Sequence, residues 1–145
     1  MRTIKYRGKT KNGEWLYGDL LQVANEVFIA PSDGDWFDFI PWSRNNVFHL
    51  PAAKYAVIPE TVGQFTGLHD KDGREIYEGD IIVSQDYSHA RHYVRYIDDE
   101  AMFVAMIIGS SLMEYCAIRQ SWIDKYDKKI IGNIYDDPEL VGKIN

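Results

Sequence analysis

The densest group of side chains able to do chemistry is a set of carboxylates in one short segment: Asp70, Asp72, Glu75, Glu78 and Asp80. Clustered carboxylates can bind a divalent cation and support metal-dependent hydrolysis. A calcium loop, however, requires oxygen ligands at positions 1, 3, 5 and 12 and glycine at position 6. With Gly73 at the glycine position, Leu68 and Gly79 occupy the first and last ligand positions, so the pattern fails. We expect turn and strand-edge roles for these acids, with a metal-dependent hydrolase as the weakest alternative.

Two histidines and one cysteine are the other reactive candidates. His89 and His92 have the spacing of two ligands on one helical face, but residues three apart in a strand point to opposite faces. Arg91 and Arg95 beside them would repel a cation. Cys116 lies in an apolar run, where a buried and unreactive thiol is expected. The chain also has no G-x-x-x-x-G-K-[ST], G-x-G-x-x-G or G-x-S-x-G motif. We therefore predict no enzyme, no catalytic residue, no metal ligand, no cofactor and no small-molecule substrate.

Aromatic residues form the most informative apolar cluster: Trp36, Phe37, Phe39 and Trp42. Four large rings within seven positions are difficult to bury together in a small lobe. One interpretation is ordinary core packing. The other is an exposed patch that a second subunit covers, since large apolar patches usually mark interfaces and tryptophan is enriched at their energetic centres. We choose the second as the hypothesis for an oligomer interface, which predicts a homo-oligomer.

Composition and charge limit the choice of partners. The 145 residues are 46% hydrophobic, 26% charged and 14% aromatic, as in an ordinary soluble domain, and the net charge is −6. Nucleic-acid binding normally requires a basic patch, and the densest basic run, Lys9-Thr10-Lys11, resembles a solvated turn. A nucleic-acid-binding module therefore remains the alternative rather than the preferred reading. Its candidate residues are Arg91, Arg95 and Arg119 with Tyr93 and Tyr96.

The sequence also predicts a cytoplasmic location. Cys116 is the only cysteine, so no intramolecular disulfide forms, which suits a reducing compartment. The first residues carry positive charge without an apolar h-region, and no run approaches the roughly 18 apolar residues that a membrane span requires. We expect no membrane association.

Short apolar runs separated by turn residues every 8 to 12 residues or so predict a mainly β, antiparallel protein. The first hairpin pairs residues 3–7 with 14–22 around Asn12-Gly13, and a strand follows at 27–30. Further strands are expected at 36–40, 55–58, 81–85, 92–97, 102–108, 112–118 and 130–135. A helix over 102–118 is the competing reading, which Gly109 and two serines disfavour. Ser121 is expected to cap a short helical turn.

The strand count suggests an SH3-like small barrel in the C-terminal part, with an N-terminal hairpin region packed beside it. Residues 43–53 are the best candidate for a boundary. The single domain of residues 1–145 would then contain lobes at 1–50 and 54–145.

Four blocks of the sequence resemble the YopX family of phage and prophage proteins. They are residues 4–8 with 12–18, residues 62–68, residues 66–83 (TGLHDKDGREIYEGDIIV) and residues 131–140. The resemblance keeps the order of the blocks and spans nearly the whole chain, and it implies a phage origin. It implies no catalytic residue. The family signature, to which we assign a structural role, comprises Thr66, Gly67, Asp70, Asp72, Gly73, Ile76, Tyr77, Glu78, Gly79, Asp80, Gly132 and Asn133. The expected function is that of a non-enzymatic binding protein that assembles with itself.

Overall fold

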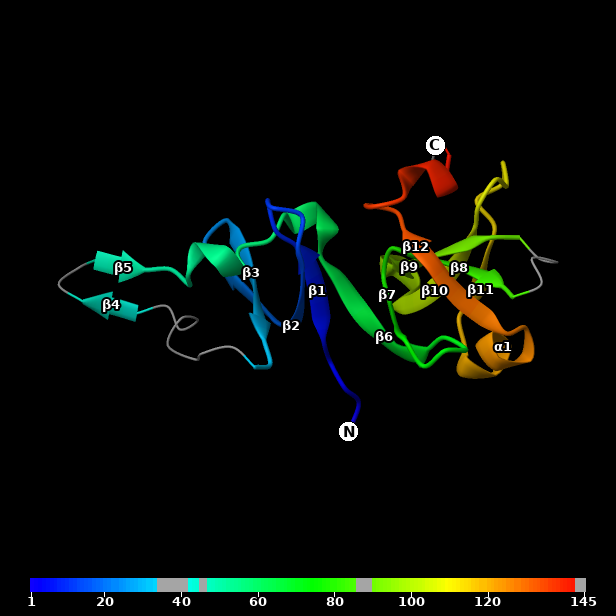
Figure 1. The fold of residues 1–145 in the computed structure, drawn as a ribbon, viewed down its shortest axis with the longest axis horizontal. Coiled ribbons are helices and arrows are strands. Elements are labelled where there is room, and N and C mark those ends of the chain that lie inside the picture. Colours follow the sequence, from blue (N-terminus) through cyan, green and yellow to red (C-terminus); the bar gives the residue numbers. More distant parts are fainter. Residues whose placement is uncertain (34–41, 45–46, 86–89, 143–145) are drawn as a thin grey trace. The chain divides into compact units, whose positions relative to one another are not determined.

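The computed structural model describes residues 1–33, 42–44, 47–85 and 90–142 (Figure 1). For residues 42–44 and 47–49 it describes the backbone alone. Its contacts divide the chain into two compact units, residues 1–64 and 65–145. This division follows Gln64 and so lies later in the chain than the expected lobes at 1–50 and 54–145.

The first unit is built on an antiparallel sheet. Strands β1 (Tyr6–Lys9), β2 (Trp15–Val23) and β3 (Glu26–Pro31) pair in sequence order, and the start of β6 (Gly63–His69) pairs with the other edge of β1. Asn12-Gly13 lies in the β1–β2 turn as predicted, with Gly13 at φ +89°. Strands β4 (Trp42–Arg44) and β5 (Val47–His49) form a separate hairpin.

Two short 3₁₀ turns, Ala53–Tyr55 and Pro59–Thr61, bring the chain back along this sheet. Between them the backbone is extended but meets β3 only at the Phe28–Ala56 bridge, so the strand expected at 55–58 is reduced to one contact. Phe28 and Tyr55 are buried together and form the centre of the apolar core.

The second unit holds the rest of β6, which pairs with β7 (Glu75–Tyr77), and a five-stranded antiparallel sheet in the order β11-β10-β9-β8-β12. These strands are β8 (Asp80–Ser84), β9 (His92–Ile97), β10 (Met102–Ile107), β11 (Tyr115–Ala117) and β12 (Lys128–Asn133). Two 3₁₀ turns, Asp98–Glu100 and Pro138–Leu140, and the helix α1 (Gln120–Lys125) complete the unit. Among the described residues, no helix has the length and apolar character that crossing a membrane demands.

Both faces of this sheet are buried, because successive residues of a strand point to opposite sides. Ile82 belongs to a core cluster with Ile123 of α1. Its neighbour Ile81 belongs to a second cluster, with Val141 from the end of the described chain. The sheet is therefore covered on one side by α1 and on the other by the C-terminal segment.

The mainly β, antiparallel fold class is confirmed, but the SH3-like barrel is not found. The outer strands of the five-stranded sheet, β11 and β12, do not pair in the described structure, so the sheet stays open. The physical reason is that α1 lies between them in the chain and places Ile123, which is fully buried, in the core. A covering helix replaces barrel closure as the means of burying this face.

The prediction of two strands within residues 102–118 is confirmed by β10 and β11. They pair antiparallel, with Met106 opposite Tyr115 and Val104 opposite Ala117. The short helix after it is also confirmed. Its predicted cap is wrong: Arg119 is the N-cap residue, no side chain caps the helix, and Ser121 lies within the first turn.

Candidate binding site

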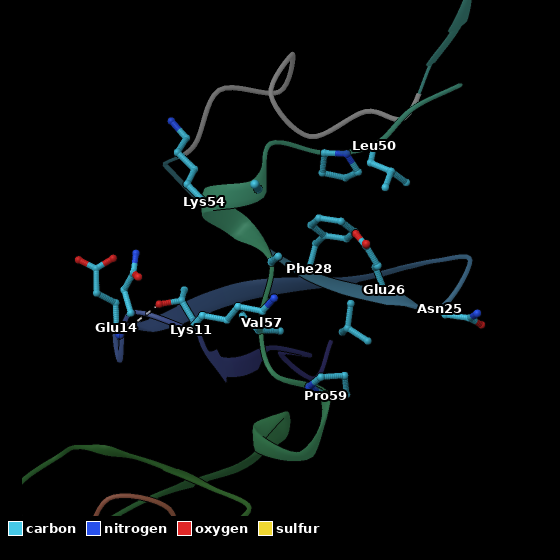
Figure 2. Close-up of a pocket in the computed structure, with 15 residues that line it drawn as sticks. Lys11, Glu14, Asn25, Glu26, Phe28, Leu50, Lys54, Val57 and Pro59 are labelled. Carbon is cyan, nitrogen blue, oxygen red and sulfur yellow. Dashed lines mark hydrogen bonds between the residues drawn. The ribbon is translucent and has the colours of Figure 1, made fainter. Parts of the chain in front are cut away.

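The first unit contains an apolar groove of about 560 Å³ (Figure 2). Three stretches of chain build it: the β1–β2 turn, the β2–β3 turn with the start of β3, and the segment that returns from Leu50 to Pro59. Figure 2 shows Phe28 between these segments and Glu14 and Lys54 toward the outer edge. Its volume falls within the range of roughly 300–1,000 Å³ that is typical of ligand-binding pockets.

The groove has apolar walls and a rim of mixed charge. Phe28 is 1% exposed and Val57 6% exposed, whereas Leu50 is 42% exposed. The remaining apolar lining residues are Val27, Pro51, Ala53, Ala56 and Pro59. Lys11 and Lys54 supply positive charge and Glu14 and Glu26 negative charge. A rim with both signs suits neither a polyanion nor a metal cation. It suits a polypeptide segment, in which an apolar side chain is flanked by polar groups of both kinds.

Hydrogen bonds keep the walls of the groove in place. Thr10, which is 6% exposed, accepts a hydrogen bond from the Glu14 amide at its hydroxyl (3.2 Å) and another at its carbonyl from Gly13 (3.0 Å). The Ile58 amide donates to the Lys9 carbonyl (2.8 Å), which fixes the returning segment to the end of β1. The run Lys9-Thr10-Lys11, which is predicted to be a solvated turn, is thus partly buried at Thr10.

No sequence signal marked this groove in advance, because its lining residues come from three separate segments between Thr10 and Pro59. Of the predicted oligomer interface, Trp36, Phe37 and Phe39 lie outside the described residues, and Trp42 begins β4. The interface hypothesis for these four residues therefore stays a prediction.

The signature residues lie in the second unit, where the Asp70 carboxylate accepts several hydrogen bonds in the turn between β6 and β7. Its Oδ1 accepts the amides of Asp72 and Arg74, each at 2.9 Å. Its Oδ2 accepts the Arg74 Nε–H and the Ile130 amide, each at 3.1 Å. Burial alone raises the pKa of Asp70, but hydrogen bonds from Ile130, Arg74 and Asp72 and the Arg74 charge outweigh it, so the pKa lies below its ordinary value.

A second signature turn joins β7 to β8. Asp80 Oδ2 accepts the Tyr77 amide at 2.8 Å. Gly79, at φ +88°, donates its amide to the Val94 carbonyl (2.8 Å) and accepts the Ile134 amide (2.9 Å). The turn thereby contacts both β9 and the segment after β12.

The other signature residues also contact the backbone or the core. Thr66 donates its hydroxyl to the Ile76 carbonyl (2.8 Å), and Ile76 itself is fully buried. Asn133, next to Gly132, accepts the amides of Tyr135 and Asp136 at its side-chain oxygen, each at 3.0 Å. Gly67 has φ +86° in β6, Gly73 has φ +81° in its turn, and Glu78 is half-buried.

The remaining chemical candidates are dispersed. Among the described residues, no three His, Cys, Asp or Glu side chains gather into a potential metal site. His92 is buried against Trp122, with ring centroids 5.2 Å apart, and His89 lies outside the described residues. Cys116 is half-buried, and burial raises its pKa although the nearby Lys128 opposes the shift.

Only some of the residues proposed for nucleic-acid binding are exposed. Arg95 and Arg119 are exposed, but Tyr93 is 8% exposed and belongs to the core cluster of Ile81. Tyr96 packs edge-on against Phe103, with centroids 5.2 Å apart. A buried ring cannot stack on a base, so Tyr93 is not available to a nucleic acid and only Tyr96 remains of the two proposed tyrosines.

These features define a mainly β protein of two compact units with an apolar groove in the first. The model of the family described as YopX protein matches residues 5–142, and the chain belongs to the YopX family. The crystal structure of protein EF1440 from Enterococcus faecalis is similar in fold, with a TM-score of 0.60 and 24% identity. The match covers 98% of this chain and 100% of that one. No curated protein matches the sequence.

Proposed function

We propose that this YopX-family protein is a non-enzymatic binding protein of a phage or prophage, which acts in the host cytoplasm and assembles with itself. The observation that carries the binding role is the apolar groove of the first unit, with its rim of two lysines and two glutamates. The proposed ligand is a segment of a partner protein that inserts one apolar side chain and surrounds it with charges of both signs.

Self-assembly has separate support. Soluble proteins rarely leave large apolar side chains together on the surface unless another molecule covers them. In the second unit Leu112, Met113 and Tyr115 are 76%, 56% and 41% exposed within four positions of one another. The aromatic run from Trp36 to Trp42 is a second proposed contact, on the strength of its sequence alone.

A displayed random-peptide library tests the binding role. Peptides selected on the intact protein should be retained by it and lost on Ala53→Trp, because Ala53 is an exposed lining residue whose enlargement fills the groove without entering the core. Glu60→Trp, exposed and outside the lining, is the matched control and should retain the peptides. Peptides bound equally by all three proteins, or no enrichment at all, would contradict the proposal.

A further inference from the structure

Strand β11 has an open edge whose hydrogen-bonding groups can be assigned from its register. The Ile107 amide donates to the Glu114 carbonyl at 2.9 Å, and Ala105 lies opposite Cys116. Hydrogen-bonded pairs alternate along an antiparallel ladder, so the amide and carbonyl of Cys116 point toward β10. Those of Tyr115 and Ala117 point away from the sheet. Within the described chain, no hydrogen bond reaches them.

Strand β11 is only three residues long, but none of its residues is charged or a proline. Charged residues, proline or a covering segment normally block such an edge. Here Tyr115, Cys116 and Ala117 form the strand, and the exposed Leu112 and Met113 precede it. The free groups lie on residues two apart, so a second extended strand of the same sequence can satisfy them.

We infer that β11 is a self-pairing surface, at which two copies of this chain join antiparallel about a twofold axis through Cys116. This inference rests on the proposed self-assembly and names the surface that performs it. In this register Tyr115 of each copy faces Ala117 of the other, and two pairs of main-chain hydrogen bonds form. The pairing is isologous, because the same patch serves both copies.

The charges around the edge are complementary in this register. Tyr115 donates its hydroxyl to the Glu100 carboxylate, which places a negative charge beside the strand. Arg119, two residues beyond Ala117, is exposed and has extended backbone at φ −141° and ψ 147°. Pairing places Arg119 of one copy diagonally across from Tyr115 of the other, close to Glu100. This complementarity favours a second copy of the chain over an unrelated strand.

Cys116 provides a direct test of the register. Two residues directly opposite at a non-hydrogen-bonded antiparallel position have Cα atoms about 4.5 Å apart, within the span of a disulfide. Diamide oxidises two thiols to one disulfide, accepting two electrons and two protons. Treatment of the intact protein should therefore give a covalent dimer on a denaturing gel, and Cys116→Ser should give none.

Two edge variants accompany this test. Ala117→Pro removes an outward-facing amide while leaving the bonds between Cys116 and β10, and Tyr115→Lys places a cation on the edge beside Arg119. Each should lower the mass of the assembly in solution by a factor of two or more and abolish the cross-link. Tyr17→Lys is the matched control, because Tyr17 on β2 is 42% exposed against 41% for Tyr115. It should change neither result.

The outcomes separate this inference from the proposed function. An assembly that persists without a Cys116 cross-link, and in both edge variants, would overturn the β11 surface while leaving self-assembly standing. A protein that is monomeric from the start would overturn both.

Discussion

The carboxylate of Asp70 accepts a hydrogen bond from the backbone amide of Ile130, sixty residues further along the chain, at 3.1 Å. This bond connects the β6–β7 turn to strand β12. The Lys71 amide, which donates to the Lys128 carbonyl at 2.9 Å, adds a second connection at the same place. Asp70, one of the acids for which turn and strand-edge roles were expected, thus holds an edge strand of the second unit in place.

Asp70→Asn should lower the free energy of unfolding by about 3 kcal/mol, because the amide nitrogen cannot accept the hydrogen bonds that one carboxylate oxygen now accepts. Urea denaturation measures the loss. Asp72→Asn is the control, since the Asp72 side chain is 57% exposed and lies 4.0 Å from Lys71. It should change stability by less than about 0.5 kcal/mol. Equal losses in the two variants would show that Asp70 has no special role.

The same carboxylate predicts a pH dependence. Its pKa is lower in the folded than in the unfolded protein, so its contribution to stability is present above the unfolded value of about 4 and disappears as the pH falls through the folded value. The stability difference between the wild type and Asp70→Asn should therefore be constant near neutral pH and shrink in acid. A stability difference that grew on acidification would contradict a lowered pKa of Asp70 in the folded protein.

Gly79 and Gly73 test the two signature turns against each other. Both have positive φ, +88° at Gly79 and +81° at Gly73. A Cβ added at Gly79 would lie 2.9 Å from Cε2 of Tyr135, whereas a Cβ added at Gly73 would have no atom within 4 Å. Gly73→Ala should cost about 1–2 kcal/mol of backbone strain. Gly79→Ala should cost clearly more, about 3 kcal/mol or above, because the turn or Tyr135 must also move. Thermal unfolding of the two variants side by side would refute this if their losses were equal.

Cys116 should react slowly for a cysteine. Burial raises its pKa, so at a given pH less of the reactive thiolate is present than in the unfolded chain. The rate of modification by a disulfide reagent, followed against pH, should have a higher midpoint in the folded protein than in urea. Lys128→Met should raise the folded midpoint further, since the Lys128 cation favours the thiolate. A folded midpoint at or below the unfolded one would contradict this.

Local sequence patterns predicted most of the strands because each depends on neighbours within a few residues. The Asn12-Gly13 turn and the break at Gly109 are of this kind. Tertiary context decided the rest. Tyr55 ends a 3₁₀ turn, and the extended residues 56–58 meet β3 at a single bridge, so the pattern of 55–58 could not reveal how little pairing this segment makes.

The groove and the open edge could not be predicted for a different reason. The groove is assembled from three separate segments, and its lining residues share no spacing that a periodic pattern would show. The strand expected at 112–118 was placed correctly in part. That Leu112 and Met113 stay exposed outside β11 depends on the positive φ of Met113, +49°, which turns the chain before the strand begins.

Self-assembly is best tested by the mass of the intact protein, measured by light scattering behind a sizing column at low and moderate salt. We expect a discrete multimer with a mass at least twice the 16.8 kDa of one chain, at both salt concentrations. A single species of 16.8 kDa under both conditions would contradict it.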